Sequence, residues 1–174
     1  MGEITGRDTG STAVEASLTG HTVFATIHTN DAPSTVTRLV DMGIEPFLIA
    51  ATLECVVAQR LVRTVCQECK QAFEPDEELE YELGDDARLV KGATLYFGKG
   101  CAKCHHTGYR GRMGLFEVMP IGEDLRRMIE TGASIEELRQ AAISGGMETL
   151  RECGLRAVAS GRTTVEEVIR ETMV

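Results

Sequence analysis

Residues 22–31 have the sequence TVFATIHTND, and this stretch decides the fold class. Its first six residues are apolar or β-branched, which is typical of a short, largely buried strand. The polar residues 28–31 then form a loop at the carboxyl end of that strand. Asn30 or Asp31 can cap a helix over about 32–42, which has a proline in its first turn and a glycine after its end. A strand followed directly by a helix predicts α/β architecture.

Helices are predicted on both sides of this strand. Residues 12–18 have the pattern of a short helix that ends before Gly20. Residues 46–62 are apolar on most sides, which predicts a second, mostly buried helix. We therefore expect residues 1–63 to form part of an α/β domain.

Composition and charge restrict the class of protein. The chain has 174 residues, of which 43% are hydrophobic and 26% charged, as in a soluble globular protein with one ordinary domain or two small ones. Its net charge of -9 disfavours nucleic acid as a partner and nonspecific binding to an anionic membrane. The longest weakly polar stretch, residues 46–57, is too short to span a bilayer. No secretory signal is visible, so we expect a cytoplasmic protein.

Four of the six cysteines form two C-x-x-C pairs, Cys66 with Cys69 and Cys101 with Cys104. Two such pairs can complete a tetrahedral thiolate site for structural Zn²⁺, which leaves no open coordination position for catalysis. The gap between the pairs exceeds the roughly 15–20 residues of common zinc sites. The acidic residues 74–86 explain the gap as an inserted helical hairpin or exposed loop, because closing a longer loop costs little.

Other roles for these cysteines are weaker. Residues 101–105 match the C-x-x-C-H pattern of haem attachment, but haem would leave the first pair unexplained and requires an exported chain. A redox pair would need a helix amino end, whereas the neighbouring glycines indicate turns. Disulfides are disfavoured without an export signal. His105 or His106 could replace one thiolate, while Cys55 and Cys153 lie in helical patterns and are expected to be inert core residues.

The carboxyl-terminal third predicts three or four short helices, separated at Gly132, Gly145–Gly146 and Gly161. Two pairs, Ser134 with Glu137 and Thr163 with Glu166, have the spacing of capping boxes. We therefore expect three regions: residues 1–63 as an α/β part, 64–119 as a tetracysteine segment, and 120–174 as a helical bundle.

No nucleotide-binding loop is visible in the chain. The pattern G-x-x-x-x-G-K-[ST] cradles phosphates with backbone N–H groups at a helix start. The nearest candidate, residues 92–99, has the wrong glycine spacing, lacks the final hydroxyl and adjoins a cysteine pair. The chain alone is expected to lack a phosphate cradle.

Several motifs together nevertheless resemble the traffic ATPases of type II secretion and type IV pilus assembly. The similarity covers essentially the whole chain and is carried by GEI at 2–4, AVEASLTGH at 13–21, ATIHTNDA at 25–32, RL at 38–39, MG at 42–43, QRLVR at 59–63, both cysteine pairs and CHHTGYRGR at 104–112. The resemblance implies the carboxyl-terminal half of a RecA-like P-loop NTPase core. It also implies use of ATP and Mg²⁺, a hexameric ring, and an inner-membrane platform protein as partner.

The resemblance also implies roles for five residues. Glu3 occupies the place of the Walker B glutamate, which polarises or orients the attacking water. His21 and His28 match the histidine box, and a carboxyl-terminal sheet edge would place His28 beside the nucleotide. Arg60 and Arg63 match arginines that sense the γ-phosphate or line a subunit interface. Judged without the resemblance, these side chains would be structural histidines, surface ion pairs and an exposed glutamate.

The sequence also departs from the family. Residues 5–10 (TGRDTG) do not align with the family's run after Gly-Glu-Ile, so Arg7 and Asp8 receive no role. The Walker A loop, the aspartate box and the amino-terminal domain have no counterpart. We therefore expect a fragment, a truncated gene product or one half of a split motor that needs a complementary Walker A chain. The alternatives are a noncatalytic zinc-stabilised module that binds motor subunits or the platform protein, and a remnant that does not fold stably.

Overall fold

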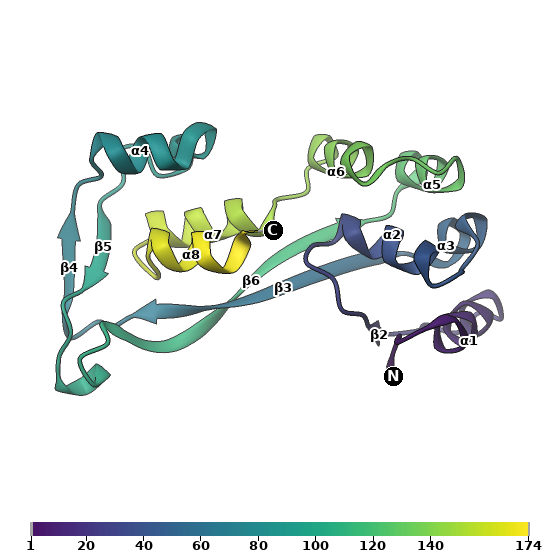
Figure 1. Ribbon diagram of the computed structural model, residues 1–174, viewed down its shortest axis with the longest axis horizontal. Coiled ribbons are helices and arrows are strands. Elements are labelled where there is room, and N and C mark those ends of the chain that lie inside the picture. Colours follow the sequence, from purple (N-terminus) through teal and green to yellow (C-terminus); the bar gives the residue numbers. More distant parts are fainter. Residues whose placement is uncertain (1, 174) are drawn as a thin grey trace. The chain divides into compact units, whose positions relative to one another are not determined.

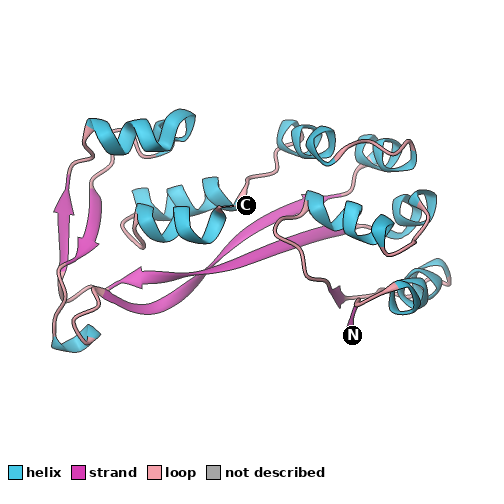
Figure 2. Ribbon diagram, viewed as in Figure 1, coloured by secondary structure: helices cyan, strands magenta, loops and turns pink. Residues whose placement is uncertain are grey.

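The structure of the protein is a computed structural model, which describes residues 2–173 without the side chains of Glu78 and Glu80. The chain forms two compact units, Met1–Ala58 with Glu117–Glu148 (unit 1) and Gln59–Phe116 with Thr149–Val174 (unit 2). The long strands β3 (Cys55–Val65) and β6 (Tyr109–Pro120) pair with each other, as Figure 2 shows, and the chain passes between the units within each of them.

Unit 1 combines a short parallel strand pair with helices (Figure 1). Strands β1 (Gly2–Glu3) and β2 (Ala25–Thr26) pair in parallel, with Glu3 opposite Thr26. The helices are α1 (Arg7–Leu18), α2 (Pro33–Asp41), α3 (Pro46–Thr52), α5 (Glu123–Glu130) and α6 (Ile135–Ser144). Apolar side chains of α2, α3, α5 and α6 form the core with Val56 and Met119 from the two long strands. The predicted α2 is confirmed.

Two predictions in this unit are wrong. The expected buried strand over 22–27 is reduced to Ala25–Thr26, and both residues are exposed because β2 belongs to a sheet of only two described strands. The expected helix over 46–62 ends at Thr52, and the chain continues as β3. The backbone is already extended at Leu53, and β-branched residues favour the strand. Cys55 is therefore an exposed strand residue rather than a helical core residue.

Unit 2 is built around an antiparallel strand pair and two packed helices. Strands β4 (Lys70–Phe73) and β5 (Leu95–Gly98) pair with Lys70 opposite Gly98. Of the two forms expected for the acidic insertion between them, the structure has the helical one, with α4 (Glu77–Leu83) and a 3₁₀ helix (Gly84–Leu89). Helices α7 (Leu150–Ala159) and α8 (Val165–Thr172) complete the unit. A separate core lies here, comprising Leu83, Val90, Leu95, Leu155, Val158, Val165 and Val168.

The carboxyl-terminal helices end at the predicted glycines, but they do not form one compact body. Helices α5 and α6 belong to unit 1, whereas α7 and α8 belong to unit 2, so a single bundle is not shown. The capping box of Ser134 and Glu137 is confirmed. The second box is wrong by one residue: Thr164 caps α8, because the Thr163 hydroxyl donates to the Arg63 carbonyl at 2.8 Å. None of the described helices combines the length and apolarity needed to cross a bilayer.

Candidate functional site

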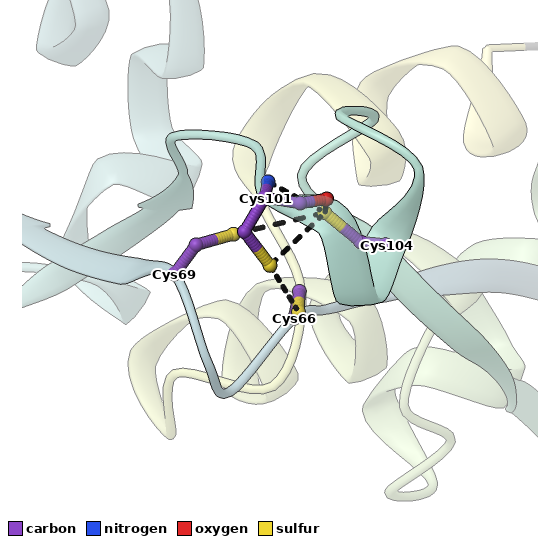
Figure 3. A group of neighbouring side chains, drawn as sticks. All are labelled: Cys66, Cys69, Cys101 and Cys104. Atoms are coloured by element: carbon purple, nitrogen blue, oxygen red, sulfur yellow. Dashed lines mark hydrogen bonds between the residues drawn. The ribbon is translucent and has the colours of Figure 1, made fainter.

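The four paired cysteines converge on one point in unit 2, as Figure 3 shows. Their sulfur atoms all lie within 4.8 Å of one another. The Sγ atoms of Cys66 and Cys101 are 4.0 Å apart, and Cys104 Sγ lies 3.8 Å from both Cys69 Sγ and Cys101 Sγ. Cys66 and Cys104 are buried, while the other two are partly exposed. The two pairs predicted from their spacing thus form a single cluster.

The strand pair β4–β5 explains how distant pairs meet. Cys69 immediately precedes β4, and Cys101 follows shortly after β5, so the register of Lys70 with Gly98 brings both pairs to the same end of the hairpin. The backbone N–H of Lys99 donates to the Cys69 carbonyl at 3.0 Å. The predicted insertion is therefore a structured hairpin that returns the chain to the first cysteine pair.

Backbone N–H groups point at the sulfur atoms. Gly100 N donates to Cys69 Sγ at 3.3 Å, and the N–H groups of Cys101 and Gly108 donate to Cys104 Sγ at 3.2 and 3.3 Å. Hydrogen bonds of this kind stabilise a thiolate relative to a thiol. The loop is tight at this point: a Cβ on Gly108, whose φ is +80°, would lie 2.4 Å from the carbonyl oxygen of Gly98.

The thiols differ in acidity because they share one crowded site. Burial, with hydrogen bonds from the other thiols, raises the pKa of Cys69 to about 12. Burial also opposes ionisation of Cys104, but the backbone N–H groups and neighbouring thiols outweigh it and lower its pKa to about 6. One thiolate is therefore favoured while a neighbour keeps its proton, which is the state expected of clustered thiols without a cation.

The donor set fits a tetrahedral zinc ion. Zn–S bonds of about 2.3 Å place tetrahedral sulfurs roughly 3.8 Å apart, close to the separations observed here. A disulfide would need sulfurs about 2.05 Å apart, and all six cysteines are free. His105 and His106 are exposed and lie outside the cluster. The haem pattern is disfavoured because Cys101 and Cys104 share their site with the first pair.

A second group of predicted site residues meets at the carboxyl edge of the β1–β2 pair. Glu3 ends β1, and His28 lies just beyond β2. His28 Nε2 is 2.9 Å from Glu3 Oε1, with 93% of the histidine side chain and 44% of the glutamate side chain exposed. His21 is elsewhere engaged, with its Nδ1 3.1 Å from the Thr19 hydroxyl. The structure thus pairs His28, rather than His21, with Glu3.

The two predicted arginines lie on β3, and not in or just after the helix expected over 46–62. Arg63 is held inside unit 2: its Nη2 donates to Glu167 Oε1 at 2.5 Å, and its guanidinium stacks 4.0 Å from the centroid of the Tyr109 ring. Glu167 is 1% exposed and also accepts the Arg63 backbone N–H at 2.9 Å. Arg60 is half-buried on the same strand. Nucleotide or interface roles for both arginines stay predictions.

Sequence inspection missed two buried polar contacts near His28. Asp31 binds Arg139 of α6, with Oδ2 and Nη2 2.8 Å apart, and Glu117 of β6 accepts the Ala32 backbone N–H at 2.7 Å. Both carboxylates are 2% exposed. The alternation of buried Leu115, Glu117 and Met119 with exposed neighbours is a strand pattern that could have indicated the buried glutamate.

Comparison with known proteins places the chain in a family. The family model described as "Type II/IV secretion system protein" matches residues 1–170. The type IV pilus assembly ATPase PilB of Myxococcus xanthus is 46% identical over 173 residues, covering 99% of this chain and 31% of that protein. Type II secretion system protein E of Pseudomonas aeruginosa is 45% identical over 172 residues, covering 99% and 34%. The chain thus spans about a third of the length of these relatives.

Solved structures agree in fold. The crystal structure of the pilus retraction motor PilT with bound ADP matches with a TM-score of 0.63 at 21% identity, covering 98% of this chain and 38% of that one. The ATPase DotB of Legionella pneumophila gives a TM-score of 0.63 at 19% identity, covering 96% and 36%. These similarities support the α/β ATPase fold. The resemblance seen in the motifs is thereby confirmed, and the chain belongs to the type II/IV secretion system protein family.

Proposed function

We propose that this chain forms the carboxyl-terminal part of a hexameric ATPase that powers type II secretion or type IV pilus assembly. The family match over residues 1–170 supports this assignment, as do relatives from both systems at similar identity. In this proposal the phosphate loop comes from another part of the motor subunit or from a complementary Walker A chain.

The Glu3–His28 pair is the observation that carries the proposal. A carboxylate at the carboxyl edge of a parallel sheet lies where α/β proteins bind ligands. There Glu3 would orient and polarise the water that attacks the γ-phosphate of Mg²⁺-bound ATP, and His28 would hold the carboxylate through Nε2. His21, which contacts the Thr19 hydroxyl, would lie on the nucleotide side as a second member of the histidine box.

The tetracysteine cluster serves a structural role in this proposal. Bound to all four thiolates, Zn²⁺ would cross-link the end of β3 to the loop between β5 and β6. Its coordination shell would be complete, so it contributes no open position for catalysis. Unit 2, stabilised in this way, would dock neighbouring subunits or the inner-membrane platform protein, with Arg60 toward an interface. The protein would act in the cytoplasm and associate peripherally with the inner membrane.

A chimera tests the proposal. The 174 residues replace the aligned segment of Pseudomonas aeruginosa type II secretion system protein E, and phosphate release is measured on the purified chimera. We expect turnover, and we expect Glu3→Gln to reduce it by about 10²-fold or more, since it removes a positioned carboxylate. A matched control is Glu45→Gln, an exposed carboxylate of unit 1 outside the pair. Equal turnover in the Glu3→Gln and parent chimeras would contradict the proposal.

A noncatalytic zinc-stabilised interaction module is the second candidate. It is favoured by the organisation of unit 2. This unit contains the cysteine cluster and has a core of its own, whereas Glu3 and His28 belong to unit 1. Mixing the chain with the Walker A portion of a relative separates the two functions. Restored turnover supports the split motor, whereas binding without turnover supports the module.

A further inference from the structure

The ion pair between Glu3 and His28 cannot fix its own geometry. Nearly all of the His28 side chain is exposed, and so is much of Glu3. Exposed pairs of this kind contribute little to stability and restrict neither side chain strongly. The position of His28 must therefore come from the loop that carries it, which joins β2 to α2.

Asp31 anchors the end of this loop in a buried site. Its Oδ1 accepts the Ser34 backbone N–H at 2.8 Å and the Ser34 hydroxyl, which is ordinary capping of α2. Its Oδ2 accepts from Arg139 Nη2 on α6, at 2.8 Å. Burial acts to raise the pKa of Asp31, but the hydrogen bonds from Ser34 and Arg139 outweigh it and keep that pKa below its ordinary value. The carboxylate is thus charged and held from two sides.

Glu117 holds the same segment from β6. Its Oε1 accepts the backbone N–H of Ala32, which is fully buried at the start of α2. A first-turn N–H has no partner within the helix, and a carboxylate there suits the helix dipole. Glu117 is a second buried carboxyl group at a helix start that Asp31 already caps, and burying a polar side chain is costly unless it is hydrogen-bonded. Thr29 adds a hydroxyl contact to Thr35 at 3.0 Å.

We propose that Arg139 and Glu117 are positioning residues for His28. They fix the Asp31–Ala32 end of the loop, and through the backbone they hold His28 opposite Glu3. Their hydrogen bonds go to Ala32 and Asp31, which lie four and three residues after His28 in the chain. Both follow the last of the four clustered cysteines in the sequence, although they belong to the same compact unit as Glu3 and His28. A role of this positioning in catalysis rests on the proposed function. The positioning of His28 by Arg139 and Glu117 does not depend on it.

The test measures how strongly His28 senses Glu3. In the zinc-bound 174-residue chain, the ¹³Cε1 and ¹Hε1 NMR signals of His28 are recorded with and without Glu3→Gln. We expect Glu3→Gln to move these signals in the parent, and to move them at least about twofold less in an Arg139→Gln background, as in a double-mutant cycle. Arg139→Lys should give an intermediate response, because lysine keeps the charge without the planar fork.

A matched variant separates positioning from general destabilisation. Arg127→Gln removes an arginine of α5 whose partner, Asp124, is exposed, and it should leave the His28 response unchanged. If Arg139→Gln does not fold by circular dichroism, Arg139→Lys and Glu117→Gln are measured in the same way. A full response in folded Arg139→Gln, or an equal loss in Arg127→Gln, would overturn the proposal. The NMR experiment uses no nucleotide, so a negative result would not affect the proposal that the chain is part of an ATPase. In the same way, an inactive chimera would not affect the proposed coupling between Arg139 and His28.

Discussion

Cys101 contributes one of four sulfur atoms that surround a single point. We expect the purified chain to contain about one zinc ion, because four thiolates complete one tetrahedral site. Cys101→Ser should reduce the bound zinc and lower the melting temperature, since metal binding and folding are coupled. Metal analysis by mass spectrometry and thermal unfolding check both effects. Cys55→Ser, at an exposed cysteine outside the cluster, is the control. A parent chain without zinc after purification under reducing conditions contradicts the assignment.

Gly108 offers a sharper test of the loop around the cysteines. Its φ of +80° disfavours a side chain, and the carbonyl of Gly98 leaves no room for one. Gly111 has a similar φ of +84° but open space around it. Gly111→Ala should therefore cost about 1–2 kcal/mol through backbone strain alone. Gly108→Ala should cost clearly more and also lose zinc, as measured by denaturant unfolding and metal analysis. Equal costs for the two variants would show that the close approach to Gly98 is unimportant.

Helix α8 is joined to β3 by a buried carboxylate. Glu167 accepts hydrogen bonds from the backbone N–H and the guanidinium of Arg63. Its Oε1 also lies 2.6 Å from Nη2 of Arg170. Burial acts to raise the pKa of Glu167, but the hydrogen bonds from Arg63 outweigh it and lower that pKa below its ordinary 4.5. A carboxylate whose pKa is lower in the folded state than in the unfolded state stabilises the fold. This stabilisation is complete at pH values above the pKa of the unfolded state. That contribution is lost as the pH falls below 4.5.

Replacement of this carboxylate should follow that pH dependence. At pH 7 we expect Glu167→Gln to reduce the free energy of unfolding by about 1–3 kcal/mol, since the backbone N–H and the guanidinium of Arg63 lose their charged acceptor. Below pH 4.5 the difference from the parent should shrink, because Glu167 then takes up a proton in the unfolded parent and, at still lower pH, in the folded parent as well. Denaturant titrations between acid and neutral pH measure it. Glu166→Gln, on the exposed face of α8, should change stability by at most about 0.5 kcal/mol. A pH-independent difference would contradict this account.

Considered as a whole, the 174-residue chain is expected to release no phosphate from ATP. Its sequence holds a candidate water-activating carboxylate but no G-x-x-x-x-G-K-[ST] loop to grip phosphates. A steady-state phosphate-release assay measures this, with an intact relative as positive control. Turnover above background that disappears in Glu3→Gln would contradict the prediction and would show that this chain holds nucleotide without help.

Features that depend on a few neighbouring residues could be predicted from the sequence. The start of α2 was predictable because Asp31 caps it and a proline follows in the first turn. The metal cluster was predictable because thiol spacing carries its own chemistry. The family resemblance gave Glu3 and His28 separate roles on the nucleotide side, but nothing in the sequence predicted that the two side chains pair.

Other features depend on tertiary contacts that no local pattern contains. Residues 46–62 form one apolar run, and a helix cannot be distinguished from a strand by hydrophobicity alone in such a run. Pairing with β6 decides the outcome from Cys55 onward. Glu167 looks like a surface residue of an amphipathic helix, and only the approach of Arg63 reveals that it is buried. The contacts of Arg139 and Glu117 join segments that are far apart in the sequence.

The two compact units are interleaved along the chain, and this has a consequence for how the protein emerges from the ribosome. Unit 1 draws its second piece from Glu117–Glu148, and unit 2 draws its second piece from Thr149 onward. Neither unit can close before its second piece has been synthesised. The four thiols leave the exit tunnel before α7 and α8 do, so they can come together before the helices that pack against Leu95 and Val90 exist.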